Sequence, residues 1–285
     1  MGLVKVMSDS AHDLPPHIIS AYGIATVPMM IYFGDEEFKD GVNLSTHEFY
    51  QRLTAGPHLP KTAQPLLSEM RQTMLDLTDD GSELVVIMLS SGLSGTSESA
   101  AMLVGEMPDR RIRVIDSLSA SLGEGLLVWF AAEMARQGAD AAAIEAAVTA
   151  KRSRLSHLFV LDTLEYLFKG GRVTKTEAFM GTVLDVKPIL HIGNDGRITP
   201  LGRARGRAKA VARLLELAEQ NYDPATQRVG VIHAHCPEEG EEFAAQLRAR
   251  LSPKELIFTE MSATIGTHVG PGLLGIVFET EGGRV

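Results

Sequence analysis

The fold class of this chain is decided by residues 83–96, which read Glu-Leu-Val-Val-Ile-Met-Leu-Ser-Ser-Gly-Leu-Ser-Gly-Thr. Residues 83–89 form a continuous apolar run, which is typical of a strand buried on both faces, as in a parallel sheet. Residues 90–96 supply glycines and hydroxyls for a turn, and residues 97–106 continue as a predicted helix. A buried strand, a turn and a helix in this order indicate an α/β fold.

The rest of the first half repeats the same alternation of strands and helices. Ser45 and Glu48 have the spacing of a capping box, so a helix is predicted to begin there. Strand–helix alternation predicts a parallel sheet with helices on both faces. The other predicted strands are residues 3–8, 25–33 and 112–115, and the other predicted helices are residues 14–22, 66–77, 126–137 and 141–153.

The second half has a different pattern, with a turn at Asn194-Asp195-Gly196 between two short apolar runs. This turn predicts a hairpin of residues 187–192 with 197–200, and hence an at least partly antiparallel sheet. We therefore expect two domains, an N-terminal parallel-sheet α/β domain at 1–153 and a C-terminal α/β domain with a mixed sheet at 154–285. A frayed tail is expected at 281–285. Further strands are predicted at 158–161, 229–233, 257–261 and 274–278, and helices at 204–221 and 237–251.

Composition limits the classes of partner. The formal net charge is −9, which argues against nucleic acid and against an anionic membrane surface as the main partner. One cysteine, Cys236, excludes an internal disulfide. No secretory signal and no run of about 20 apolar residues is visible, so no transmembrane segment and a cytoplasmic location are expected.

The turn after the buried strand is the strongest candidate for a ligand site. Loops at the carboxyl ends of parallel strands bind ligands, and free N–H groups at a helix N-terminus attract anions. Ser91 and Ser94 add hydroxyl donors, and Gly95 allows close approach of a ligand to the backbone. The alternative interpretation is a serine-rich helix cap with no ligand.

Two further segments carry polar side chains beside glycine or proline. Thr62 lies in Lys61-Thr62-Ala63-Gln64-Pro65, where it is either a ligand contact or a helix cap. His268 lies in residues 265–272, a glycine-rich stretch predicted to be a loop that displays the imidazole. A histidine there can hydrogen-bond to an anion, or it can simply occupy a turn.

A hydrolase is the alternative function. Gly92-Leu93-Ser94-Gly95-Thr96 differs by one residue from the G-x-S-x-G nucleophile elbow, and Ser94 and His268 occur in the order of an α/β-hydrolase. However, no HGGG-type oxyanion segment precedes this motif, and the second half is predicted to form a separate domain. The sequence pattern alone leaves this alternative open.

Cations gather in two places in an otherwise acidic chain, Lys169–Arg172 and Arg203–Arg207. Arginine suits bidentate contact with phosphate or carboxylate, although solvated helix ends are the simpler interpretation. His233, His235 and Cys236 resemble metal ligands, but a strand directs only the two histidines to one face. No metal site and no nucleotide site is therefore predicted.

These motifs, taken together and in order, resemble the DegV family, which includes the FakB-type fatty-acid-binding subunits of bacterial fatty acid kinase. The resemblance extends through almost the whole chain. Ala63 departs from the family's usual Thr-Ser-Gln-Pro motif but leaves Thr62 in place. The matching segments are 8–15, 62–65, 91–96, 114–117, 164–172, 187–190, 205–206 and 266–272.

The resemblance implies a long-chain fatty acid bound between two domains. Its carboxylate would be held by Thr62 and Ser94 with His268 close by, and its tail would lie in an apolar tunnel. A separate ATP-using kinase subunit would phosphorylate the carboxyl group, and Arg172 and Arg205 would contact that partner or the acyl phosphate. The chain would then be a carrier without catalytic residues or a cofactor of its own.

The physical chemistry of a fatty acid agrees with such a carrier. Burying about 14 methylenes at about 0.8 kcal/mol each gives roughly 11 kcal/mol before the cost of association. The carboxylate must be hydrogen-bonded, because an unpaired buried charge would cancel much of that gain. Hydroxyls and backbone N–H groups can supply these bonds.

Overall fold

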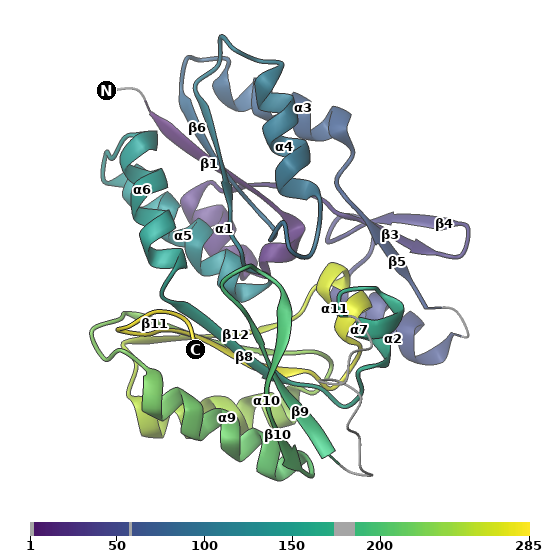
Figure 1. The fold of residues 1–285 in the computed structure, drawn as a ribbon. Helices are drawn as coiled ribbons and strands as arrows, with labels where there is room; N and C mark the ends of the chain where they lie inside the picture. Colours follow the sequence, from purple (N-terminus) through teal and green to yellow (C-terminus); the bar gives the residue numbers. More distant parts are fainter. Residues whose placement is uncertain (1–2, 57–58, 174–185) are drawn as a thin grey trace.

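The computed structural model describes residues 3–56, 59–173 and 186–285. The chain forms a four-stranded sheet in its first half and a six-stranded sheet in its second half, with a small third sheet at one side (Figure 1). Helix α5 (Leu122–Arg136) lies between the two large sheets, because it contacts β1 and β6 of the first and β8 and β11 of the second. Its nearly complete burial follows from this position.

The first sheet is parallel throughout, in the order β2-β1-β6-β7. The run that predicted a buried strand is β6, and residues 84–88 are fully buried. Val85 and Ile87 pack in the core cluster that contains α5, whereas Val86 and Met88 pack with α3 and α4 on the other face. The strands are β1 (Val4–Asp9), β2 (Ala25–Val27), β6 (Glu83–Met88) and β7 (Ile112–Asp116).

Helices cover both faces of this sheet, as the alternation predicted. The capping box at Ser45 is present, since Ser45 Oγ accepts a hydrogen bond from the Glu48 N–H at 3.2 Å. Helix α5 begins four residues earlier than predicted. The other helices of the first half are the 3-10 helix η1 (Ser10–His12), α1 (Pro16–Tyr22), α2 (Thr46–Ala55), α3 (Leu67–Thr78), α4 (Thr96–Gly105) and α6 (Ala141–Arg152).

The small sheet was not predicted. Residues 25–33, expected as one strand, form two strands in different sheets, because β2 pairs with β1 whereas β3 pairs with β4 and β5. Pro28 stands between them and lacks the N–H that a continuous strand needs. The small sheet matters for function because it carries Thr62. Its strands are β3 (Met30–Phe33), β4 (Glu36–Lys39) and β5 (Lys61–Ala63).

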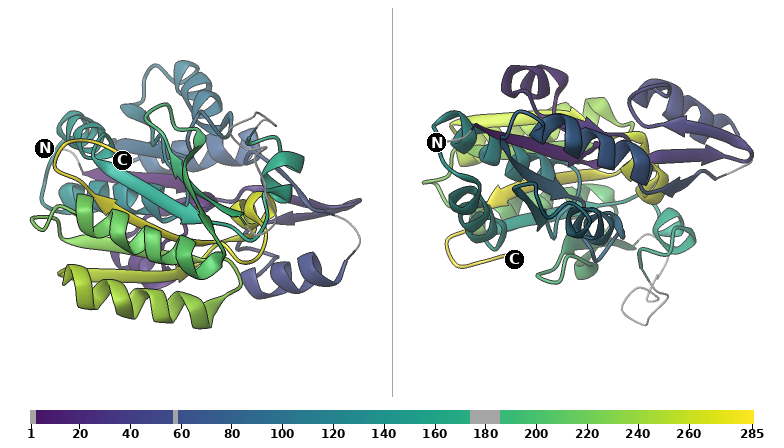
Figure 2. Two further views of the ribbon diagram at one scale, coloured as in Figure 1. Left: turned by 60° about the horizontal axis from the view of Figure 1, so that its bottom comes forward. Right: turned by 90° about the horizontal axis from the view of Figure 1, so that it is seen from above.

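The second sheet is mixed, in the order β10-β9-β8-β13-β11-β12. The predicted hairpin is present as antiparallel β9 and β10. Helices α9 (Arg207–Asn221) and α10 (Pro237–Leu251) run side by side on the outer face (Figure 2). The short α7 (Glu165–Lys169) follows β8. The strands are β8 (Leu155–Val160), β9 (Val186–Ile192), β10 (Ile198–Arg205), β11 (Arg228–His233), β12 (Glu255–Glu260) and β13 (Leu274–Glu279).

Two expectations for the second half were wrong. Residues 204 and 205 belong to β10 rather than to a helix, because Gly206 has a φ of 81° and separates the strand from α9. The tail at 281–285 is not frayed. Arg284 Nη1 donates to the carbonyls of Leu118 and Gly193, both at 2.8 Å, and thereby connects the two halves of the chain.

Helix α6 ends at Arg152 and β8 of the second sheet begins at Leu155. The predicted division at residues 153 and 154 falls between these elements but stays a prediction, since α5 packs against both sheets. No helix in the described ranges is long and apolar enough to cross a membrane.

Candidate functional site

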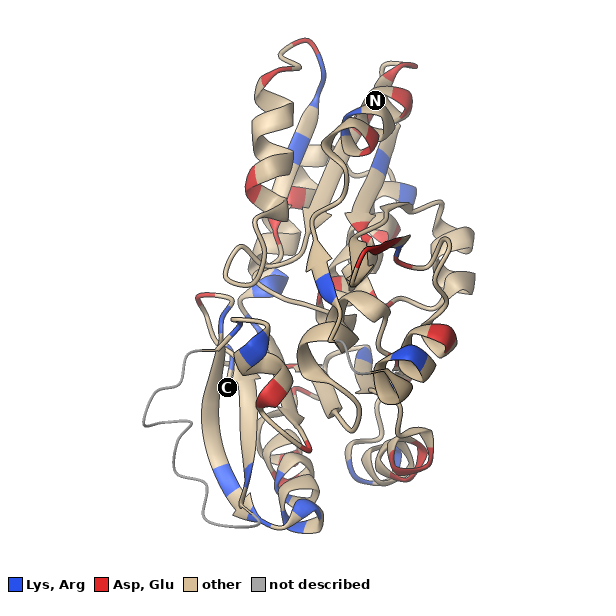
Figure 3. Cartoon of the chain, turned by 90° about the vertical axis from the view of Figure 1, so that its right-hand side faces the viewer, with Lys and Arg blue, Asp and Glu red and all other residues tan. Residues whose placement is uncertain are grey.

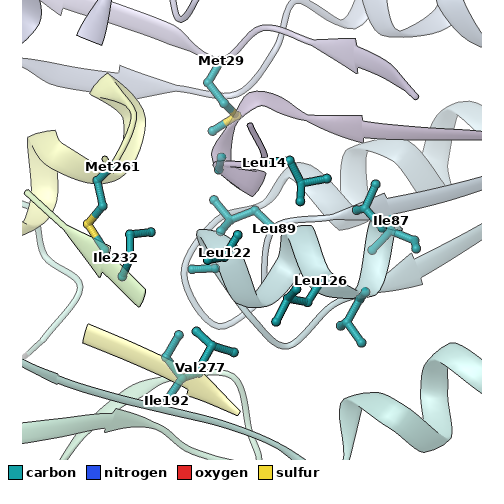
Figure 4. Close-up of a cluster of buried hydrophobic side chains, with 14 of the residues drawn as sticks. Leu14, Met29, Ile87, Leu89, Leu122, Leu126, Ile192, Ile232, Met261 and Val277 are labelled. Carbon is teal, nitrogen blue, oxygen red and sulfur yellow. The ribbon is translucent and has the colours of Figure 1, made fainter. Parts of the chain in front are cut away.

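A pocket lies between the first-half loops and the second sheet. Its lining is mostly apolar, as in most small-molecule sites. Figure 4 shows several of the apolar side chains that surround it. Its apolar lining includes Met29, Leu89, Leu93, Ala120, Phe159, Leu167, Ile192, Ile198, Ile232, Met261, Ile265, Val269, Leu273 and Val277.

Four polar residues of the lining form what we call the head-group cluster: Thr62, Ser94, Arg172 and His268. Thr62 lies on β5, Ser94 lies just before α4, and Arg172 follows α7. With His268 of the C-terminal region, they come from four separate parts of the chain, and the fold alone brings them to one pocket. Three of the four are the residues that the family resemblance assigned to the carboxylate.

His268 lies on a helix, α11 (Ala263–Val269), and not in a displayed loop as expected. Its Nε2 is 2.7 Å from Thr62 Oγ1. Burial, with a smaller effect from the Arg172 charge, lowers the pKa of His268 to about 3, so the imidazole is neutral at physiological pH. Its Nδ1 is buried without a hydrogen-bond partner among the described residues.

Ser94 lies in the turn that was predicted to bind an anion. Its Oγ is 2.8 Å from Thr96 Oγ1. Gly95 is the N-cap residue of α4 and no side chain caps that helix, which leaves the helix end open to a ligand. A Cβ atom at Gly95 would lie 2.5 Å from Gln64 Nε2, so the Gln64 side chain packs closely against this turn. Gln64 was not singled out from the sequence.

Arg172 is placed in the pocket, although the sequence had suggested contact with a partner or phosphate. Its Nε donates to the Leu93 carbonyl at 3.2 Å and its Nη1 to the Gly170 carbonyl at 2.6 Å. Partial burial lowers its pKa, and no acidic group of the described residues offsets that shift. A ligand carboxylate would meet this unpaired guanidinium.

Three predicted site residues lie outside the pocket lining: Ser91, Gly95 and Arg205. Ser91 is exposed, and its backbone N–H donates to Asp116 Oδ1 at 3.1 Å. Arg205 is exposed at the end of β10, opposite Val186 of β9. Figure 3 shows the Lys and Arg positions along this hairpin. Arg172 and Arg205 therefore do not share one site in this structure.

The hydrolase alternative requires contact between a nucleophile and a base. Ser94 Oγ pairs with Thr96, whereas the His268 imidazole pairs with Thr62. No carboxylate of the described residues orients His268 Nδ1. The contacts in this structure do not assemble a Ser–His–Asp triad.

Four carboxyl groups buried beside the site were missed by sequence reasoning: Asp9, Asp13, Asp40 and Glu124. Burial raises the pKa of Asp9 to about 6 and that of Asp13 to about 7, and it raises the pKa of Glu124 well above its usual range. Asp9 and Asp13 flank η1 at the carboxyl end of β1. Their position after a predicted strand was the one signal available.

Two of these aspartates hold α11 in place. Asp13 Oδ1 accepts the N–H of Ser262 at 3.0 Å, and Asp40 Oδ2 accepts the N–H of Thr264 at 3.2 Å and its hydroxyl. Both N–H groups belong to the first turn of α11, where helices leave donors unsatisfied. Residues from the first half therefore cap the helix that carries His268.

The side chains of His233, His235 and Cys236, whose sequence pattern resembles a set of metal ligands, do not converge on one metal site. His233 stacks on Phe258 and His235 stacks on Tyr50, with ring centroids 5.0 Å and 5.1 Å apart. Within the described ranges, no group of three or more His, Cys, Asp or Glu side chains could hold a metal ion.

A parallel sheet, a mixed sheet and a small third sheet, with a mostly apolar pocket between the two halves, define an α/β protein with an internal pocket. A family model described as "Uncharacterised protein, DegV family COG1307" matches residues 3–281. The chain belongs to the DegV family.

Individual relatives match over nearly the full chain. A DegV domain-containing protein of Caldanaerobacter subterraneus is 35% identical over 282 residues, which are 99% of this chain and 100% of the relative. The crystal structure of DegV from Bacillus subtilis, described as a fatty acid binding protein, has a TM-score of 0.90 at 30% identity, with 99% of this chain and 100% of that chain covered. A Thermus thermophilus DegV family protein, described by its fatty acid binding, has a TM-score of 0.87 at 28% identity, covering 99% and 100%.

Proposed function

We propose that this chain binds one long-chain fatty acid, with the carboxylate at the head-group cluster and the acyl chain in the apolar pocket. The observation that carries the proposal is the position of Thr62, Ser94, Arg172 and His268 on one mostly apolar pocket. The descriptions of the Bacillus and Thermus relatives as fatty acid binding support the same ligand.

The cluster suits a carboxylate because it combines neutral donors with one unpaired cation. The hydroxyls of Thr62 and Ser94 can both donate, and charge-assisted hydrogen bonds are roughly twice as strong as neutral ones. Arg172 supplies the opposite charge without an acidic competitor. The apolar lining then favours a long hydrocarbon chain over a short polar anion.

The finer part of the proposal is that the chain presents this carboxylate to a separate fatty acid kinase subunit and performs no chemistry of its own. Ser94 and His268 are not paired as nucleophile and base, which supports a carrier. Arg205 is exposed and free of the pocket, so it is available to a protein partner or to the acyl phosphate.

Mass spectrometry of the purified protein tests the ligand, first in the native state and then after organic extraction. We expect one fatty acid per chain, released intact. The double variant Thr62→Ala/Ser94→Ala should lose it, because two donors to the buried carboxylate are removed. Ser91→Ala, which removes an exposed hydroxyl three residues away from Ser94, is the matched control and should retain it. An empty wild-type protein that also fails to take up added fatty acid contradicts the proposal.

A further inference from the structure

His157 is a polar side chain of the pocket lining that does not belong to the head-group cluster. It lies on β8 and is 4% exposed. It lines the pocket together with Phe159, which is two residues further along and points to the same face of the strand. An imidazole at this place needs a hydrogen-bonding partner, because a buried polar group without one costs free energy.

This imidazole lies away from the head-group cluster. On β13, His157 is opposite Val277, and Leu273 lies just before the strand, on the side of α11 and His268. Four residues of strand separate Leu273 from Val277, which corresponds to roughly 13 Å. His157 would therefore meet the acyl chain far from the carboxylate.

One ring nitrogen of His157 has a partner and the other has none. Nε2 is 3.2 Å from Ser119 Oγ. No hydrogen bond from the described part of the chain reaches Nδ1. A Cβ atom at Gly123 of α5 would lie 1.6 Å from His157 Cε1, so α5 packs directly on the ring and fixes its orientation. The free nitrogen belongs to a ring that is held rigidly in the pocket wall.

The ring is neutral, which determines the chemistry it can recognise. Burial lowers the pKa of His157 well below its usual value, and the nearby Arg284 and His191 lower it further. A neutral imidazole has one donor and one acceptor nitrogen, and the tautomer decides which of them is Nδ1. A hydroxyl both donates and accepts, so it pairs with either tautomer, whereas a methylene pairs with neither.

We propose that His157, supported by Ser119, forms a second polar subsite for a hydroxyl group on the distal part of the acyl chain, so that the pocket accepts a hydroxylated long-chain fatty acid. This inference rests on the proposed function and names the substrate class of the same pocket. It assigns to His157 a role in ligand selection that the carboxylate site does not supply.

The test compares stearic acid with a series of hydroxystearic acids that differ only in the position of the hydroxyl, by competition for the wild-type protein. One position, or two neighbouring ones, should bind at least about 10-fold more tightly than the other isomers, because only there does the hydroxyl regain a hydrogen bond. In His157→Leu this preference for one hydroxyl position should disappear.

His157→Gln keeps a donor and an acceptor and should retain part of the preference, which separates hydrogen bonding from a packing defect. The wild-type series is informative even if His157→Leu folds poorly. Hydroxystearic acids that all bind more weakly than stearic acid, with no dependence on position, would overturn the subsite and leave a bound water as the partner of Nδ1. Failure of stearic acid and all isomers to bind would instead overturn the proposed function, and the subsite with it.

Discussion

His268 brings a neutral imidazole, and not a positive charge, to the head-group cluster. Its pKa of about 3 follows from burial on α11. In the proposed complex, Arg172 supplies the attraction for the carboxylate, and hydrogen bonds to Thr62, Ser94 and His268 orient it. This assignment gives single residues distinct roles that mutation can separate.

Arg172→Gln should lower the affinity for a long-chain fatty acid by about 10- to 100-fold. A hydrogen bond to a charged group contributes about 1.5–3 kcal/mol, and glutamine retains polarity without the charge. Isothermal titration with palmitate measures the change. Arg205→Gln is the matched control, since Arg205 is exposed and lies outside the pocket lining, and its affinity should equal that of the wild type. Equal losses of palmitate affinity in Arg172→Gln and Arg205→Gln would contradict the assignment of the positive charge near the carboxylate to Arg172.

The buried carboxyl group of Asp13 makes stability depend on pH. Its folded pKa is about 7 against an unfolded value of 3.8, so the folded protein binds the proton more tightly. The free energy of unfolding should therefore fall as pH rises from about 4 to about 7. Urea unfolding at pH 5 and pH 8, on ligand-free protein, measures this fall.

Asp13→Asn should reduce that fall by roughly 1–3 kcal/mol, since an amide can still accept from Ser262 and donate to Ser121 without titrating. Asp35→Asn, at an exposed position, should leave the pH profile unchanged. An Asp13→Asn profile as steep as that of the wild type would assign the effect to other groups.

Among the elements, α11 depends most on tertiary contacts. Its sequence, Ala-Thr-Ile-Gly-Thr-His-Val, has weak intrinsic helix propensity because of its glycine and β-branched residues. Asp13 and Asp40 satisfy its first turn, and Gly266 allows α2 to pack against it. The position of His268 is therefore set by contacts from the first half of the chain.

Gly266→Ala should displace α11 and weaken both stability and ligand binding. The new methyl group would lie 2.6 Å from Phe49 Cε1 and 2.8 Å from Tyr50 Oη, and overpacking of this kind costs about 1–3 kcal/mol. Gly105→Ala, in α4, meets no atom within 4 Å and should be neutral or slightly stabilising. Thermal melting and palmitate titration of the two variants give the comparison, and identical behaviour would contradict the close packing of α11.

On the scale of the whole molecule, the pocket lies where the two halves meet. Helix α5 joins the sheets, and Arg284 and the Ser90 hydroxyl add hydrogen bonds to the turn of the second half at residues 193–196. Lys187, Arg203 and Arg205 of the β9–β10 hairpin lie outside the pocket lining, on a molecule whose net charge is −9. A partner that approaches the hairpin need not enter the pocket.

If the proposed kinase partner is correct, Arg203→Glu/Arg205→Glu should abolish ATP-dependent phosphorylation of the bound fatty acid by that subunit. Both side chains are exposed, so reversal of their charge repels an acidic partner face without touching the ligand. Acyl phosphate formation is the readout, and an unchanged affinity for palmitate is the internal control. Wild-type rates in this variant would remove the hairpin from the proposed interface.

Much of the architecture could be predicted from local pattern. The buried run of β6, the capping box of α2, the β9–β10 hairpin and the full extent of α10 all follow from periodicity, caps and turns, which depend on residues close together in the chain. The order of motifs also identified the family, and with it the residues to examine in the pocket.

Other features were decided only by tertiary structure. The helical state of α11 and the burial of Asp13 and Asp40 depend on contacts between segments more than 200 residues apart in the chain. The neutral charge of His268 depends on its burial, in part against α7. Sequence alone determined which elements form and which chemical groups are available. The three-dimensional packing decided which of these groups meet, because desolvation and hydrogen bonding between distant segments exist only in the folded chain.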